Sequence, residues 1–133
     1  MLCIRYSPPD DLEISGDVSD LAAVADGLHR VAAQKISAIR IPADDTCDRG
    51  LYVMVLSELV LQRATGLPRV AVICNSVEIL GAAEGLDVVA SYFEFPGDAE
   101  VGEHHHLEYY EGATHLLRQS CPVIITIDSN GVA

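Results

Sequence analysis

The chain repeats one pattern at an interval of 65 residues. Segments 12–28 and 77–93 share six of seventeen aligned positions, and each predicts a strand, a glycine and an amphipathic helix. Random composition seldom keeps apolar spacing aligned across two successive elements, so we interpret the repeat as an internal duplication. The duplication predicts two β-β-α-β-β units, at 1–66 and 67–133.

Neither unit is large enough to fold stably alone. A unit of about 65 residues buries too little apolar surface for an independent core, so the two halves are expected to share one core in a single compact domain. Eight strands and two helices then predict an α+β fold, with both helices packed on a predominantly antiparallel sheet or on two joined sheets.

A helix is expected to start at Asp17. This residue suits an N-cap, and an apolar stripe runs at helical spacing from Leu21 to Ala32. His29 lies near the C-terminal end, where a cation suits the helix dipole, and no other role is expected of it. A second helix is expected to run to about Phe93. Strands are expected at 2–6, 12–15, 37–41, 57–62, 69–74, 77–80, 105–110 and 123–127.

The four cysteines are widely spaced. Cys3, Cys74 and Cys121 lie in apolar strand-like runs, where a thiol behaves as a small hydrophobic group. Neither a paired zinc spacing nor the dense pattern of a small secreted domain is present. We therefore expect all four, including Cys47, to be reduced.

The chain is strongly acidic. Its formal net charge is −12, of which residues 66–133 carry −8, and no Lys or Arg occurs between Arg69 and Arg118. Nucleic-acid binding is disfavoured because phosphate contacts need a basic surface. The acidity serves solubility, or it steers a basic protein partner to the surface.

Apolar runs such as 70–74 and 123–127 are much shorter than the roughly 20 residues that cross a bilayer. The N-terminal residues turn polar before the apolar core of a secretory signal could form. A soluble, cytoplasmic protein is therefore expected, with no membrane contact.

Three consecutive histidines are the main candidate for chemistry. On a strand, His104 and His106 project to one face together with Glu108, and His105 points to the other face. With His115 folded back from the next loop, these side chains could hold zinc or another divalent metal. Alternate strand residues lie about 6.5–7 Å apart, which is wide for three ligands of one ion. We favour a polar partner surface, and leave metal binding and acid–base catalysis as alternatives.

A hydrolytic site lacks sequence support. Ser120 with His115 is the only nucleophile and base pair near the histidines, and no catalytic signature such as GxSxG, a P-loop or HExxH occurs. Gly16 and Gly81 precede helix starts, but acidic neighbours make them poor anion sites, so both are interpreted as turn residues.

Tyr109 and Tyr110 lie between two glutamates, a composition common at protein-binding surfaces. The residues expected to contact a partner are His104, His106, Glu108, Tyr110 and Glu111. No catalytic residue and no cofactor is expected. The alternative metal set is His104, His106 and His115.

The second half resembles the immunity protein 32 family of bacterial polymorphic toxin systems. The resemblance covers residues 70–128 and rests on segment 77–81, the helix with Leu86 and Ala90, segment 104–110, His115, and Ser120 leading into 123–125. The first half would be a divergent copy without the histidines. The resemblance implies a non-enzymatic cytoplasmic antidote that binds a cognate toxin domain, and the acidic surface predicts that this toxin is basic. A metal-binding or hydrolytic protein, or a subunit that oligomerises through the duplicated sheet, are the other hypotheses.

Overall fold

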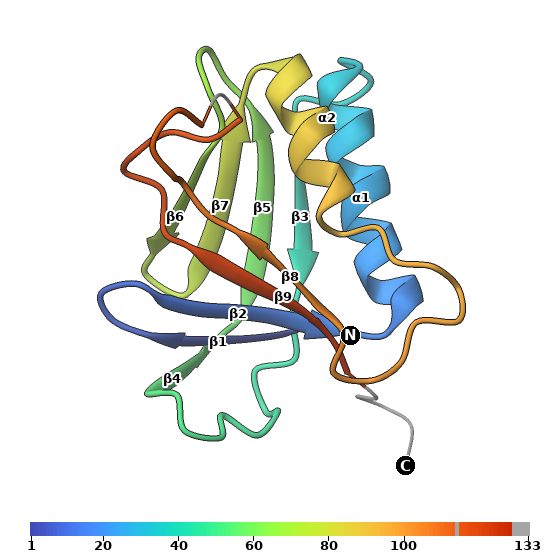
Figure 1. Ribbon diagram of the computed structural model, residues 1–133, viewed down its shortest axis with the longest axis vertical. Coiled ribbons are helices and arrows are strands. Elements are labelled where there is room, and N and C mark those ends of the chain that lie inside the picture. The colour runs from blue at the N-terminus through green and yellow to red at the C-terminus, as the bar shows by residue number, and fades with distance from the viewer. Residues whose placement is uncertain (114, 129–133) are drawn as a thin grey trace.

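The computed structural model describes residues 1–113 and 115–128, and this part of the chain folds into nine strands and two helices (Figure 1). The fold class is α+β, as the sequence predicts. In chain order the elements are β1 (Cys3–Ser7), β2 (Asp11–Gly16), α1 (Val18–Ala32), β3 (Ala38–Pro42), β4 (Met54–Leu56), β5 (Glu58–Arg63), β6 (Arg69–Ile73), β7 (Ser76–Gly81), α2 (Ala83–Ser91), β8 (His104–Leu107) and β9 (Val123–Ile127). Neither helix in the described residues has the length and apolar character needed to cross a bilayer.

The strands form two sheets. Five strands are ordered β4-β1-β2-β9-β8, and four are ordered β3-β5-β7-β6. Neighbouring strands run antiparallel except at β2/β9 and β5/β7, where the pairing is parallel. The prediction of a predominantly antiparallel arrangement is therefore confirmed, with one parallel junction inside each sheet.

The two halves are interleaved. Each sheet joins the opening hairpin of one half, β1–β2 or β6–β7, to two later strands of the other half, β9 and β8 or β5 and β3. The two parallel pairings connect the halves. β2 pairs with β9 from Leu12 opposite Val123, and β7 pairs with β5 from Ser76 opposite Glu58. Apart from β4, which pairs with β1 and has no counterpart among the described strands of the second half, the two halves follow one scheme of pairing, while their origin by gene duplication stays a prediction.

One buried cluster includes residues from both halves. The stripe predicted for α1 is buried at every position: Leu21, Val24, Ala25, Leu28, Val31 and Ala32. α1 packs against α2, whose Leu86, Val89 and Ala90 are buried, and the two helices lie side by side in Figure 1. Asp17 caps α1 as predicted, and its side chain and that of Asp20 form reciprocal bonds with backbone N–H groups.

The strand predicted at 105–110 is shorter and begins earlier. β8 ends at Leu107, which lies opposite Val123 in β9. Continuing the same register would place Glu108 opposite Pro122, which has no N–H to donate. The prediction that the strand continues through Glu108 is therefore wrong, while Glu108 still lines one hollow together with His106. The structure also adds β4, which pairs with β1 and was not predicted.

Gly16 and Gly81 are not turn residues. Each is the last residue of a strand, and neither has a positive φ. A Cβ on Gly81 would lie 2.7 Å from Pro68 Cα, and one on Gly85 would overlap the ring of the same proline. Close packing explains Gly81 and Gly85, because Pro68 lies directly against the backbone at the end of β7 and in the first turn of α2, where a side chain would not fit.

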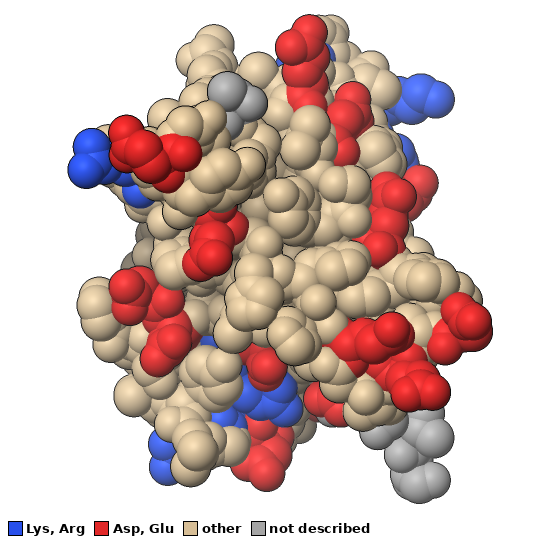
Figure 2. Space-filling view, viewed as in Figure 1, with Lys and Arg blue, Asp and Glu red and all other residues tan. Residues whose placement is uncertain are grey.

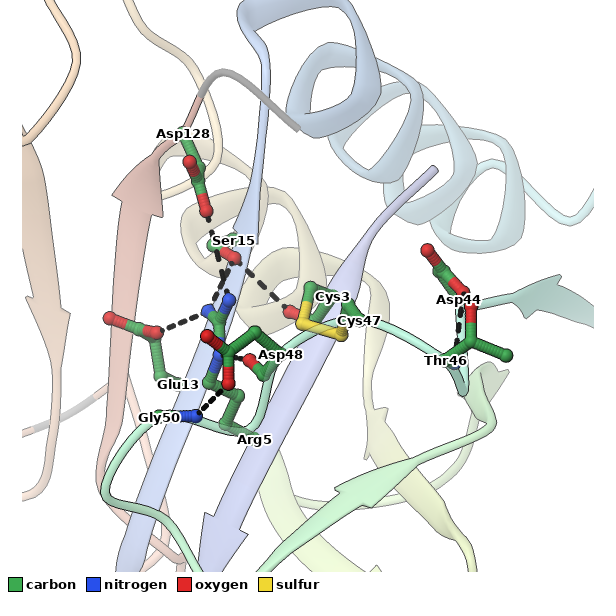
Figure 3. Close-up of a disulfide and its surroundings, with 10 residues drawn as sticks. All are labelled: Cys3, Arg5, Glu13, Ser15, Asp44, Thr46, Cys47, Asp48, Gly50 and Asp128. Carbon is green, nitrogen blue, oxygen red and sulfur yellow. Dashed lines mark hydrogen bonds and ion pairs between the residues drawn. A yellow bond between two sulfur atoms is a disulfide. The ribbon is translucent and has the colours of Figure 1, made fainter. Parts of the chain in front are cut away.

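A disulfide joins Cys3 to Cys47 (Figure 3). The prediction of four reduced cysteines is wrong for this pair, and Cys74 and Cys121 are free. Cys3 is fully buried in β1, and Cys47 lies in the loop between β3 and β4. The 44-residue separation hid the pair from sequence reasoning, because only the folded sheet brings this loop over β1.

Arg5, two residues after Cys3 on β1, holds the same loop. Its Nη1 donates to Glu13 Oε1 at 2.8 Å and to Ser15 Oγ at 3.1 Å, and its Nε donates to the carbonyl of Asp48 at 2.6 Å (Figure 3). The Arg5 and Glu13 side chains are only 14% and 19% exposed. Removing one partner would leave the other charge largely desolvated, so the network fixes the loop to the sheet.

We expect Cys47→Ser to lower the free energy of unfolding by about 2–4 kcal/mol, because the disulfide closes a long loop in the unfolded chain. Urea denaturation of the oxidised proteins measures the loss. Cys74→Ser is the matched control, since Cys74 is free and exposed, and it should change the midpoint little. Equal midpoints for Cys47→Ser and the parent protein would contradict the expectation.

Candidate functional site

The triple histidine lies on an edge strand. β8 pairs only with β9 among the described strands, and the register places His104 opposite Thr126 and His106 opposite Ile124. His104 and His106 are exposed on the outer face, and their ring centres are 5.0 Å apart. His104 Nδ1 is 3.0 Å from the carbonyl oxygen of Gly102. The predicted alternation of the three side chains is thus confirmed.

His105 points inward and has a structural role. Its ring stacks on Phe95, with centroids 4.1 Å apart and planes 7° apart. Its Nδ1 lies 2.9 Å from the carbonyl oxygen of Tyr92, at the C-terminal end of α2. His105 therefore attaches β8 to the segment that leaves α2.

His115 lies apart from the exposed histidine pair. It stacks with Tyr92 at a centroid distance of 5.8 Å, approaches Tyr110 at 5.6 Å, and has Nε2 3.4 Å from the Tyr92 hydroxyl. Within residues 1–113 and 115–128, no three His, Cys, Asp or Glu side chains converge as a metal site. The placement of these side chains therefore does not support the set of His104, His106 and His115 as ligands of one ion.

Ser120 and Cys121 do not form a nucleophilic site with His115. Ser120 is buried, and its Oγ accepts a hydrogen bond from the backbone N–H of Val70 at 3.1 Å. This bond satisfies one N–H group on the edge strand β6. Burial raises the pKa of the Cys121 thiol to about 11, so it stays protonated near neutral pH. Both residues are explained by packing against β6.

The other predicted contact residues follow β8 and are exposed. Glu108 lines a hollow of about 180 Å³ together with His106, Asp10 and Asp11. Tyr110 is 61% exposed beside His115, and Glu111 follows it in a turn. The structure thus places Glu108 near His106, and Tyr110 near His115.

Three hollows of about 630, 420 and 680 Å³ lie along α2, β8 and the loops beside them, and we call them together the α2–β8 groove. The first and second share Tyr92, and the second and third share His104 and His105. Its main lining residues are Leu67, Pro68, Glu84, Val88, Ser91, Tyr92, Phe95, Glu100, Val101, Glu103, His104, His105, His106 and His115.

Apolar side chains are exposed along this groove. Leu67 and Val88 are 42% and 44% exposed at one end, and Val101 is 65% exposed at the other. Tyr110, which contacts the groove residue His115, adds a further exposed ring. Exposed apolar side chains gathered along one groove, rather than scattered singly, are typical of an interaction surface.

Three carboxylates, those of Glu84, Glu100 and Glu103, line the groove. Figure 2 shows a central area without Lys, Arg, Asp or Glu on this face of the molecule, with several acidic side chains around it and basic side chains near the margin. The exposed acidic residues of the segment without Lys or Arg are Glu84, Asp87, Glu94, Asp98, Glu100, Glu103, Glu108 and Glu111. A single sign of charge around a depression concentrates the field there and attracts cationic groups.

His29 has a role that the sequence did not predict. Its Nδ1 lies 2.7 Å from Asp87 Oδ1 in α2, and its Nε2 lies 3.1 Å from Glu94 Oε1. Hydrogen bonds to Asp87 and then to Glu94 raise the pKa of His29 above its ordinary value. His29 therefore connects α1 to α2 and neutralises part of the acidic segment. No local pattern could reveal partners 58 and 65 residues away.

No family model matches the chain, and neither curated proteins nor solved structures gave a significant match.

The pKa of His29 predicts how its contribution to stability depends on pH. Because the pKa is raised in the folded state, the stabilisation is fully present below the unfolded pKa of about 6.5 and is lost as pH rises through the folded pKa. All three side chains are about half exposed, so the effect should stay below about 1 kcal/mol.

Urea denaturation of the parent protein and His29→Gln between about pH 5.5 and pH 9 measures this contribution. The difference in free energy of unfolding should be largest at the acidic end and shrink toward pH 9. His106→Gln serves as the control, because His106 makes no side-chain hydrogen bond to the described residues. A difference that is constant across the range would contradict the expectation.

Proposed function

We propose that this chain is an antidote protein of a bacterial polymorphic toxin system, which binds a cognate basic toxin domain in the α2–β8 groove and blocks it. The observation that carries the proposal is the composition of the groove. Exposed apolar and aromatic side chains lie there beside the negative charges of Glu84, Glu100 and Glu103. The resemblance of residues 70–128 to the immunity protein 32 family gives the proposal its biological setting.

The groove divides binding into two tasks. Glu84, Glu100 and Glu103 line it, and their negative field would speed the encounter with a basic surface. Leu67, Val88 and Tyr92 would then accept apolar side chains of the toxin, because buried apolar and aromatic contacts carry most of the binding energy at such interfaces. No chemical step is required, since covering the toxin is enough to block it.

Three of the contact residues predicted from sequence adjoin this groove. His104 and His106 line its middle section, and Tyr110 contacts His115 at one end. Glu108 and Glu111 lie on the chain that follows β8, where they would contribute to the encounter field. This assignment keeps the predicted set, and it adds the apolar lining as the part that holds the partner.

Charge reversal tests the steering role. The double variant Glu108→Lys/Glu111→Lys should slow association with the cognate toxin domain by about tenfold at low salt. Thermal stability should change little, because neither carboxylate makes a hydrogen bond or ion pair with the described residues. Surface plasmon resonance at two salt concentrations measures the rate. Asp45→Lys, at an exposed site in the β3–β4 loop, is the control. Loss of stability with capture intact would show that these residues support the fold instead.

Truncation of the groove tests the holding role. Leu67→Ser with Val88→Ser should raise the dissociation rate and weaken affinity by about tenfold or more, while association stays near that of the parent protein. Co-expression with the toxin domain should then fail to restore cell growth. Ile73→Ser, another exposed apolar residue but outside the groove, is the matched control. Unchanged dissociation in the double variant would place the partner elsewhere.

Cytoplasmic residence is part of the proposal, and the disulfide bears on it. Disulfides persist mainly in oxidising compartments and are rare in the cytosol. Lysis of cells directly into denaturant with excess alkylating reagent, which gives access to every reduced thiol including Cys3, followed by a count of modified cysteines, tests the compartment. Four modified cysteines would support cytoplasmic residence, and modification of Cys74 and Cys121 alone would move the encounter with the toxin to an oxidising compartment.

A further inference from the structure

We propose that His104 and His106 form a two-histidine chelate for a divalent transition-metal ion, with Cu²⁺ preferred, on the outer face of β8. The two residues are separated by one residue on an edge strand, so both imidazoles lie on the same side of the sheet. The site uses only two protein ligands, and water would fill the other positions. This inference does not depend on the proposed toxin partner.

The ring separation fits one shared ion. With a metal–nitrogen bond of about 2.1 Å, an imidazole centre lies about 3.2 Å from the metal, so two cis or tetrahedral ligands have centres about 4.5–5.2 Å apart. The rings of His104 and His106 are 5.0 Å apart, with an interplanar angle of 77°. Both side chains are exposed, so their rings can turn toward an ion without moving the strand.

The hydrogen bond of His104 orients one ligand. With Nδ1 3.0 Å from the carbonyl of Gly102, the ring donates from Nδ1 and keeps the lone pair of Nε2 for a metal. Histidine ligands are commonly fixed in this way, by an N–H bond to a backbone carbonyl. His106 makes no hydrogen bond to the described residues, so both of its nitrogens remain available. His105 is directed to the other side, where it is held by Phe95 and Tyr92.

The surroundings favour a cation. Glu100 and Glu103 line the hollow that includes His104, and Glu108, Asp10 and Asp11 line the one that includes His106. No Lys or Arg lines either hollow. This field favours divalent cations in general, and the imidazole ligands select among them: affinities should follow Cu²⁺ above Ni²⁺ and Zn²⁺.

Titration of the purified full chain with Cu²⁺, followed by calorimetry and by electron paramagnetic resonance, tests the site. One ion should bind per chain, with pulsed spectra that report two imidazole nitrogens. His104→Ala and His106→Ala should each weaken binding by more than about tenfold, since the loss of even an outer partner of a ligand costs about this much. His115→Gln should leave the affinity unchanged.

The decisive comparison separates a folded site from three adjacent histidines in any chain. His105→Asn keeps a side-chain amide that can donate toward the Tyr92 carbonyl, and it should bind Cu²⁺ like the parent protein, with circular dichroism confirming the fold. The chain unfolded in urea should bind more weakly than the folded chain. Equal losses in all three single variants, or undiminished binding in urea, would overturn the proposal.

Discussion

The parallel pairings of β2 with β9 and of β5 with β7 are the interactions on which the rest of the structure depends. Each links a strand from one half of the chain to a strand from the other, so neither sheet is complete without both halves. The same pairings place α1 beside α2 and bring β8 to the free edge of the larger sheet. The α2–β8 groove is therefore a product of the interleaving, because its two walls come into place through strands that the first half supplies.

Sequence reasoning succeeded where the signal is local. The apolar stripe of α1, its Asp17 cap and the alternation of the three histidines all follow from spacing along one element, and the structure confirms them. The end of β8 was mistaken by three residues, because it is decided by Pro122 on the partner strand rather than by its own composition. A period of two along 105–110 predicts a strand but carries no information about the ladder opposite it.

The features that sequence reasoning missed are long-range. The Cys3–Cys47 bond and the contacts of His29 with Asp87 and Glu94 join residues that meet only after the sheets and helices have assembled. For the same reason, only part of the candidate site could be predicted. The exposed histidines and carboxylates could be identified from their own segment, whereas Leu67 and Val88 could not. These two come from a loop and a helix that Pro68 packs together across Gly85, a contact without a sequence signature.

The interleaved sheets also set the order of assembly during synthesis. β2 leaves the ribosome long before its partner β9, which follows both helices and every other described strand. The β1–β2 hairpin must therefore wait, with one edge of β2 unsatisfied, until β9 has been translated. A nascent chain that has not reached β9 lacks the strand against which β8 is laid, so any capacity that resides in the groove begins only after β9 has been made.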